Sequence, residues 1–275
     1  MTKRILSLQD ISCVGQCSLT VALPIISACG VELSILPSAV LSTHTGGFQG
    51  FTFRDLTEDI PAIVSHWRKE KLRFDALYTG YLGNAEQIRL VEEMYPSLFT
   101  EDAPLIVDPA MADNGRLYAG FDGEFVKHMA HLCSMATVIL PNVTEACLMT
   151  GMPYRESFDD AYVDELLART ADLGCDTVLL TGAFSHKEYS GVALWQKGEI
   201  LRYRHPRIAK GSHGTGDVYA SAFVGALMRG KSLLDSARIA ADFTLLCIKE
   251  TQKEPDHWYG ARFEPVLGEL IRMLS

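Results

Sequence analysis

The segment ATVILPN (residues 136–142) is a short apolar run that ends in a proline and an asparagine. A second run, CDTVLLTG (residues 175–182), has the same character. Because neither run alternates polar with apolar residues, both are typical of strands covered on two faces, which occur mainly in parallel sheets. The two segments therefore predict an α/β protein in which helical layers sandwich a mostly parallel central sheet.

The same pattern extends outward in both directions. Strand-like runs at 4–9, 74–81 and 103–108 alternate with amphipathic helical stretches at 18–30 and 84–95. Later segments predict a hairpin and two closing helices, at 190–206, 232–250 and 263–274. Since 48% of the 275 residues are hydrophobic and no linker or repeat interrupts the chain, we expect one domain over residues 1–275.

The composition excludes several classes of protein. With 34 acidic against 25 basic residues, the net charge of −9 argues against a nucleic-acid or anionic-membrane surface. The first apolar run is too short for a signal-peptide core and no later run approaches a membrane span, so we expect a cytoplasmic protein. The seven cysteines lack CxxC spacing, which indicates free thiols rather than a zinc site or a disulfide framework.

Polar residues with useful chemistry follow the predicted strands. These residues are Asp10, Tyr81, Asp108, Asn142 and Thr181. Ligands of open α/β sheets bind beyond the carboxyl ends of the strands. We therefore predict a ligand site at that edge of the sheet.

The segment GTGDVYAS (residues 214–221) opens a late helical pattern with an acidic residue. Asp217 could be an ordinary acidic residue in the first turn of a helix, where its interaction with the helix dipole stabilises the helix by about 0.3–1 kcal/mol. Alternatively, Gly214 and Gly216 let backbone N–H groups converge on a phosphoryl group, and Asp217 accepts a proton from an attacking alcohol. This segment alone leaves both interpretations open.

Asp108, Asn142 and Glu145 carry oxygen atoms of the kind that Mg²⁺ on a nucleotide requires. Asn142 and Glu145 also have the spacing of a helix N-cap and its capping-box acid, and this second interpretation stays open beside the first. The glycine- and aromatic-rich loop at 42–53 predicts either a lid over the site or an ordinary connector.

A formal P-loop match, GxxxxGK[ST], spans residues 225–232. A true P-loop follows a strand, whereas this match lies inside a helical pattern. We therefore interpret Gly230 as a helix-terminating glycine and Ser232 as the N-cap of the next helix, with Asp235 as its capping-box partner.

Taken together, GTGD, TGYLG, VDPAMADNG and LPNVTEA resemble the ribokinase superfamily, and specifically the pyridoxal kinase branch of vitamin B6 salvage. The similarity covers nearly the whole chain. TGYLGNAEQ with STHTGG narrows it to the B6 kinases and the related hydroxymethylpyrimidine kinases.

The resemblance implies a three-layer α/β/α domain, ATP with Mg²⁺, phosphorylation of the 5′-hydroxymethyl group of a B6 vitamer, and a homodimer; a K⁺ requirement stays open. Carried over by position, the implied catalytic residues are Asp217 with Gly214, Thr215 and Gly216 as its anion hole. The implied substrate contacts are Asp10, Ser42, Thr45 and Tyr81. The implied nucleotide and metal residues are Asp108, Asn142, Glu145 and Thr181, with Asp108 and Glu145 in the metal–phosphate network.

One position departs from that pattern. Where many pyridoxal kinases have Gln-Ser-His, this chain has Gln9-Asp10-Ile11. An aspartate here could hold a protonated pyridine nitrogen through a charge-assisted hydrogen bond, or it could simply cap the following turn. Two alternatives to a B6 kinase also stay open: a hydroxymethylpyrimidine kinase of thiamine synthesis, and a non-catalytic B6-binding protein.

Overall fold

The computed structural model describes residues 2–208 and 213–275. A nine-stranded sheet forms its centre, with strand order β11-β10-β9-β8-β5-β4-β1-β2-β3. The strands are β1 (Arg4–Ser12), β2 (Glu32–Leu41), β3 (Phe53–Asp55), β4 (Ala76–Thr79), β5 (Leu105–Val107), β8 (Val138–Ile139), β9 (Thr177–Thr181), β10 (Tyr189–Gln196) and β11 (Glu199–Pro206). A separate two-stranded hairpin consists of β6 (Ala112–Asp113) and β7 (Arg116–Leu117).

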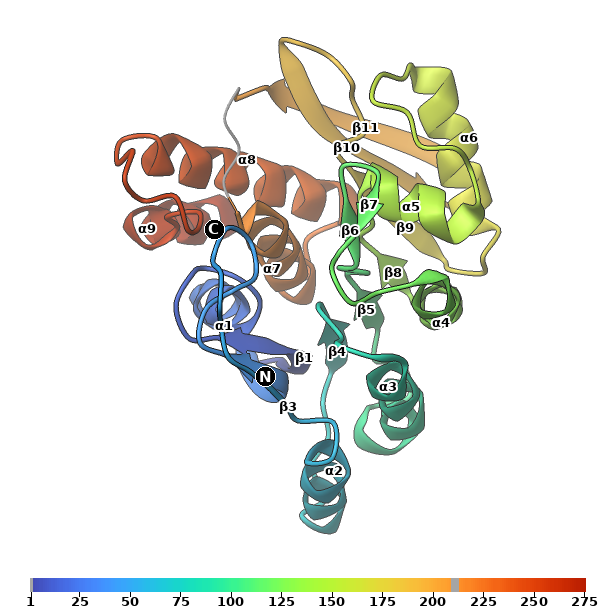
Figure 1. Cartoon of the computed structure of the whole chain (residues 1–275), viewed down its shortest axis with the longest axis vertical. Coiled ribbons are helices and arrows are strands. Elements are labelled where there is room, and N and C mark those ends of the chain that lie inside the picture. The colour runs from blue at the N-terminus through green and yellow to red at the C-terminus, as the bar shows by residue number, and fades with distance from the viewer. Residues whose placement is uncertain (1, 209–212) are drawn as a thin grey trace.

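Helices cover both faces of this sheet (Figure 1). One layer contains α2 (Ile60–Lys69), α3 (Ala85–Leu98), α4 (Gly123–Ser134), α5 (Val143–Thr150) and α6 (Asp160–Ala171). The opposite layer contains α1 (Leu19–Ala28), α7 (Thr215–Met228), α8 (Leu233–Thr251), the 3₁₀ turn η1 (Glu264–Val266) and α9 (Leu267–Leu274). Each layer buries its own apolar core against the sheet, so the predicted three-layer architecture is confirmed.

The six central strands are parallel, and antiparallel strands close both edges of the sheet. The predicted hairpin at 190–206 is confirmed as β10 and β11. Its turn places Lys197 and Gly198 at φ 50° and 86°, and two positive φ values match the twist of a two-residue hairpin loop. No helix in residues 2–208 and 213–275 is both long enough and apolar enough to cross a membrane.

The P-loop match lies on a helix, as its sequence context predicts. Helix α7 continues through Gly225, where a Cβ atom would lie 2.4 Å from Cys29 Sγ, so glycine there permits close packing on α1. Gly230 follows the end of α7 with φ 86°, and Ser232 caps α8 by accepting the Asp235 N–H at 3.1 Å. The match is therefore a helix end followed by a helix start.

We predict that Lys231→Ala leaves the KM for ATP and kcat within about twofold of wild type, since surface substitutions away from specific features have small effects. Steady-state kinetics with varied ATP provides the measurement. A large rise in the KM for ATP would mean that this lysine contacts phosphate after all.

Candidate active site

The site lies at the carboxyl edge of the central strands, but Asp10 is not placed as predicted. The expectation that Asp10 follows the first strand is wrong, because β1 continues to Ser12 by pairing with β2 as far as Leu41. The pairing register shifts between Gln9 and Ile11, and such irregularities redirect side chains. Asp10 is only 5% exposed and accepts a hydrogen bond from Ser12 Oγ at 3.0 Å.

Asp217 occupies the first turn of α7, where the helix dipole favours a negative charge. Burial nevertheless raises its pKa from 3.8 to about 7, and the charge of Asp10 adds to the rise. Hydrogen bonds from the Ser18 backbone N–H and the Cys17 thiol act in the opposite direction. A carboxyl group with this pKa can both hold and release a proton near neutral pH.

Of the two glycines before Asp217, the structure requires only one. Gly214 is the N-cap of α7 at φ 75°, and a Cβ atom there would lie 1.9 Å from the Gln16 carbonyl oxygen. Gly216 differs from expectation, because it is an ordinary helical residue inside α7 and none of the residues that the structure describes lies within 4 Å of a Cβ built on it. Gly214 therefore shapes the turn, whereas the described residues place no such demand on Gly216.

Asp108 and Glu145 form an acidic pair beside Asp217. The pKa of Asp108 lies well above its usual value because the group is buried and because the charges of Glu145 and Asp217 face it. Burial likewise raises the pKa of Glu145 to about 8. Both Glu145 oxygens already accept backbone N–H groups, from Met111 at 3.1 Å and from Asn142 at 2.8 Å.

This acidic pair fits a Mg²⁺ ion carried by a nucleotide. No group of three or more metal-ligating side chains is found in residues 2–208 and 213–275, so the described protein atoms do not form a closed cage. Mg²⁺ commonly uses one or two carboxylates together with phosphates and water. A cation there would relieve the repulsion between Asp108 and Glu145. Among the residues that the structure describes, backbone N–H groups donate to the Glu145 carboxylate and none donates to that of Asp108.

Asn142 and Glu145 form the predicted capping box of α5. Asn142 Oδ1 accepts the Glu145 N–H at 2.9 Å, and its Nδ2 donates to the Ala112 carbonyl at 2.8 Å. Thr181 ends β9 beside Asn142 and donates its N–H to the Pro141 carbonyl at 2.9 Å. The structural interpretation of Asn142 is thus confirmed, while its nucleotide role stays a prediction.

A cavity of about 440 Å³ opens beside these residues. Asn142 and Thr181 line it, as do the aromatic rings of Tyr154 and Phe184 and the cationic Arg207 at the end of β11. Because the chain carries a net charge of −9, an arginine in this wall supplies local positive charge that a phosphate requires. The cavity is large enough for a small ligand and is lined by two residues for which the family resemblance implies a nucleotide role.

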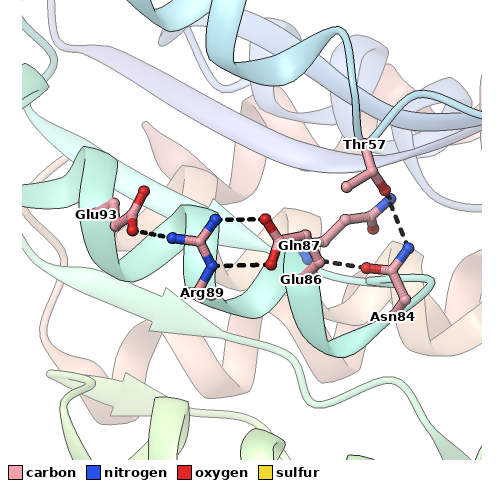
Figure 2. Close-up of polar contacts among 6 residues, drawn as sticks. All are labelled: Thr57, Asn84, Glu86, Gln87, Arg89 and Glu93. Carbon is pink, nitrogen blue, oxygen red and sulfur yellow. Dashed lines mark hydrogen bonds and ion pairs between the residues drawn. The ribbon is translucent and has the colours of Figure 1, made fainter.

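Tyr81 lies two residues beyond β4, in a loop that α3 holds in place. Gln87, fully buried, accepts the Gly83 N–H at 2.7 Å and donates to the Ser38 carbonyl at 3.0 Å and to Thr57 Oγ1 at 2.9 Å. Figure 2 shows Gln87, Thr57 and the N-cap Asn84 pointing toward one another, with Arg89 paired to acids on the outer face of α3. The loop is therefore fixed from both sides.

Burial raises the pKa of the Tyr81 hydroxyl, and the negative charge of Asp10 adds to the rise. The Tyr81 ring packs against Phe121, with 5.5 Å between ring centroids. An aromatic face beside a buried carboxylate suits a flat heterocycle that carries a positive charge.

The loop at 42–53 is anchored at its base rather than fully free. Ser42 and Thr45 are both exposed. The Ser42 Oγ accepts the Thr52 N–H at 2.9 Å and so closes the base of the loop. His44 is buried; its Nδ1 accepts the Gly46 N–H at 3.0 Å and its Nε2 contacts the Tyr259 carbonyl at 2.7 Å. The substrate roles of Ser42 and Thr45 and the function of a lid stay predictions.

Sequence reasoning missed four residues that shape the site: Ser18, His44, Gln87 and Arg207. His44 lies inside the STHTGG segment and Gln87 ends TGYLGNAEQ, so both side chains belong to segments that carry a family signal. Arg207 shortly precedes GTGD, where a cation near an anion site is a usable signal. Ser18 carried no signal in the sequence.

A carboxylate at a helix N-terminus, on the carboxyl edge of a parallel α/β sheet and beside two further acids, defines a ribokinase-like phosphotransferase. The chain belongs to the phosphomethylpyrimidine kinase family, whose sequence model matches residues 38–261. The membership in the pyridoxal kinase branch of the ribokinase superfamily that the resemblance implies is thus confirmed.

Three relatives illustrate the similarity. A Bacteroides thetaiotaomicron protein assigned to the phosphomethylpyrimidine kinases and crystallised with pyridoxal has a TM-score of 0.92 and 37% identity, over 98% of this chain and 96% of that one. Pyridoxal kinase from Lactobacillus plantarum has a TM-score of 0.91 and 30% identity, over 99% and 98% of the two chains. The hydroxymethylpyrimidine/phosphomethylpyrimidine kinase of Bacillus subtilis is 28% identical over 219 residues, 78% of this chain and 77% of that relative.

Proposed function

We propose that this protein transfers the γ-phosphate of ATP to the 5′-hydroxymethyl group of pyridoxal, pyridoxine or pyridoxamine. The observation that carries the proposal is the buried Asp10 carboxylate in β1, whose charge acts on both Asp217 and the Tyr81 hydroxyl. In the described part of the chain, no lysine or arginine forms an ion pair with Asp10, and burial raises its pKa. A protonated ring nitrogen would supply the missing positive partner.

The residues around Asp217 account for the chemistry of transfer. The substrate hydroxyl oxygen attacks the γ-phosphorus, the bond from that phosphorus to the bridging oxygen breaks, and ADP leaves. Asp217 takes the hydroxyl proton, while the backbone N–H groups at the start of α7, shaped by Gly214, face the moving phosphoryl group. Positioning and electrostatics therefore account for most of the acceleration.

Mg²⁺ bound with the nucleotide would neutralise the charge that develops on the phosphates. Asp108 would hold it, directly or through water, and Glu145 would orient the surrounding backbone at Met111 and Asn142. Thr181 and Asn142 would face the nucleotide from the wall of the cavity. Dimerisation, cytoplasmic location and any K⁺ requirement stay predictions.

A hydroxymethylpyrimidine kinase is the second candidate, favoured by the family model and by the Bacillus subtilis relative. Both substrates present a hydroxymethyl group on a nitrogen heterocycle, so the same Asp217 chemistry serves either. A non-catalytic vitamer-binding protein is less well supported, because a pure binder has no need of a carboxylate at the start of α7.

Steady-state ADP release with Mg²⁺ and K⁺ present, measured for pyridoxal, pyridoxine, pyridoxamine and hydroxymethylpyrimidine side by side, separates these functions. We expect the highest kcat/KM with a B6 vitamer. Preference for hydroxymethylpyrimidine would establish the second candidate. Binding of pyridoxal without substrate-dependent ATP consumption would establish a binding protein.

We predict that Asp10→Ser raises the KM for the B6 vitamers about 5- to 30-fold, because a charge-assisted hydrogen bond becomes a neutral one. The KM for ATP should change little. The melting temperature should not fall at neutral pH, since burial opposes the charge on Asp10 in the free protein. Lost stability with an unchanged vitamer KM would instead identify Asp10 as a structural residue of β1.

A further inference from the structure

The loop at 42–53 rests on a segment from the other end of the chain. Phe48 packs against Trp258, with 4.6 Å between ring centroids and 46° between the ring planes. Gly47, at φ 89°, passes so close to the same indole that a Cβ atom there would lie 2.8 Å from it. Because the two rings are more than two hundred residues apart in the sequence, only the tertiary fold brings them together.

A histidine of the loop reaches the same segment through a hydrogen bond. The Nδ1 atom of His44 accepts the Gly46 N–H at 3.0 Å, so this ring nitrogen carries no proton. The proton of the neutral ring therefore lies on Nε2, which donates to the Tyr259 carbonyl at 2.7 Å. The loop is thus joined to residues 258–259 by an aromatic pair and by a hydrogen bond.

Residues 257–260, which we call the loop seat, are held in turn by Gln16. The Gln16 N–H donates to the Tyr259 carbonyl at 3.4 Å, and its Oε1 lies 3.1 Å from His257 Nε2. The Gln16 carbonyl oxygen is also the group on which Gly214 packs in the turn before α7. One residue therefore connects the loop seat to the start of α7.

Trp258 contributes little to the apolar core. Its side chain is 48% exposed, and neither core of the described residues includes it. Within the described residues its ring pairs only with Phe48 and with its neighbour Tyr259. A large aromatic residue at this place is therefore better explained by its contact with the loop than by the packing of the fold.

The loop that Trp258 holds borders the site. Strand β2 pairs in parallel with β1, the strand of Asp10, as far as Leu41, so the loop begins at the carboxyl edge of the sheet. At its other side, the His44 ring lies 5.5 Å from that of His213 in the turn before α7. The loop therefore lies next to both the strand of the expected substrate contact and the turn of the expected general base.

We propose that Trp258 is a positioning residue for the substrate, whose indole holds Phe48, and with it loop 42–53, closed beside the bound heterocycle. The inference rests on the proposed function, in which that heterocycle lies at Asp10. A loop held in this way excludes water and slows the release of the substrate. Its loss should therefore weaken the binding of the vitamer and leave the binding of the nucleotide unchanged.

We expect Trp258→Ala to raise the KM for the preferred vitamer about 3- to 10-fold, the effect of losing one aromatic pair, with kcat and the KM for ATP within about twofold. Trp258→Phe keeps an aromatic face and should recover most of this loss. Phe48→Ala removes the same contact from the loop side and should have the same effect. Ile271→Ala, at a side chain that is 51% exposed on α9, is the matched control and should leave the vitamer KM unchanged.

A double-mutant cycle separates the contact from independent effects of the two rings. Trp258→Ala should raise the vitamer KM less in a Phe48→Ala background than in wild type, because its partner is already gone. The melting temperatures of all variants are measured in parallel, since a purely structural role would lower stability without changing the vitamer KM.

Tryptophan fluorescence provides an arm that needs no turnover. Trp67 and Trp195 are the other two tryptophans, so replacing both with phenylalanine leaves Trp258 as the single emitter. In this background, Phe48→Ala should increase the quenching of Trp258 by acrylamide, because the ring that covers one face of the indole is gone.

An unchanged vitamer KM in Trp258→Ala or in Phe48→Ala would overturn the inference, whatever the stability of the variant. So would strictly additive effects of the two substitutions on that KM, or acrylamide quenching that Phe48→Ala does not alter. A wild-type protein that phosphorylates none of the four test substrates, but in which Phe48→Ala still exposes Trp258, would refute the proposed function and with it the role toward a vitamer, while the contact between loop and seat would stand.

Discussion

Asp217→Asn is expected to lower kcat by roughly 10²–10⁴-fold, which is the usual effect of losing a general base. The affinity for ATP should stay nearly unchanged. The amide keeps the shape of the side chain at the start of α7 but cannot take up the proton of the attacking hydroxyl. Its melting temperature at neutral pH should equal or exceed that of wild type, because burial opposes the charge that the substitution removes. Single-turnover kinetics and ATP binding provide the measurements.

Asp235→Asn is the matched control for this prediction. Asp235 occupies the same place in the first turn of α8 that Asp217 occupies in α7, three residues after the N-cap, but it is exposed and pairs with Arg238. Only the Asp217 variant should lose turnover. Near-wild-type activity in Asp217→Asn would reduce that residue to an ordinary helix-start acid.

If Asp217 is the general base, kcat should depend on pH. With a pKa of about 7, Asp217 is ionised above that pH and protonated below it, and only the ionised form can act as a base. Wild-type kcat should therefore fall about tenfold per pH unit below pH 7 and reach a plateau above it. The residual activity of Asp217→Asn should lack this acid limb.

Gly214→Ala should be the most damaging change in the turn before α7. An alanine there would combine a φ of 75° with a Cβ atom 1.9 Å from the Gln16 carbonyl, so the turn or the 15–18 segment has to shift. We expect the unfolding free energy to fall by about 2–4 kcal/mol and kcat by about 10²–10³-fold, the usual cost of displacing anion-hole donors. Denaturant unfolding and kinetics test the two effects separately.

Gly216→Ala serves as the control within the same turn. Within residues 2–208 and 213–275 nothing lies within 4 Å of its Cβ position, and its φ is ordinary, so alanine should keep or slightly increase stability in helix α7. A loss of kcat in Gly216→Ala without a loss of stability would indicate that the open space before α7 belongs to the ligand. Equal destabilisation by Gly214→Ala and Gly216→Ala would contradict the conclusion that the fold requires glycine at 214 but not at 216.

Local sequence patterns predicted most of the fold. The apolar runs at 136–142 and 175–182 became β8 and β9, and the capping signals at Asn142 and Ser232 became the observed starts of α5 and α8. Such features depend on residues near one another in the chain, which is why they can be recognised without the tertiary structure. The end of β1 could not be recognised in this way, because it depends on how far along the chain β2 continues to pair with β1.

The sequence by itself determined that helices cover both faces of a mostly parallel sheet, and that Asp217 lies at a helix start. Only the tertiary structure decided which side chains face one another: it brought Asp10, Asp108 and Asp217 close enough for their charges to interact. It also decided that Gly214 is required and Gly216 is not, since that depends on the Gln16 carbonyl, nearly two hundred residues earlier in the chain. Burial and charge proximity arise from contacts across the fold, and these contacts set the pKa values on which the proposed chemistry depends.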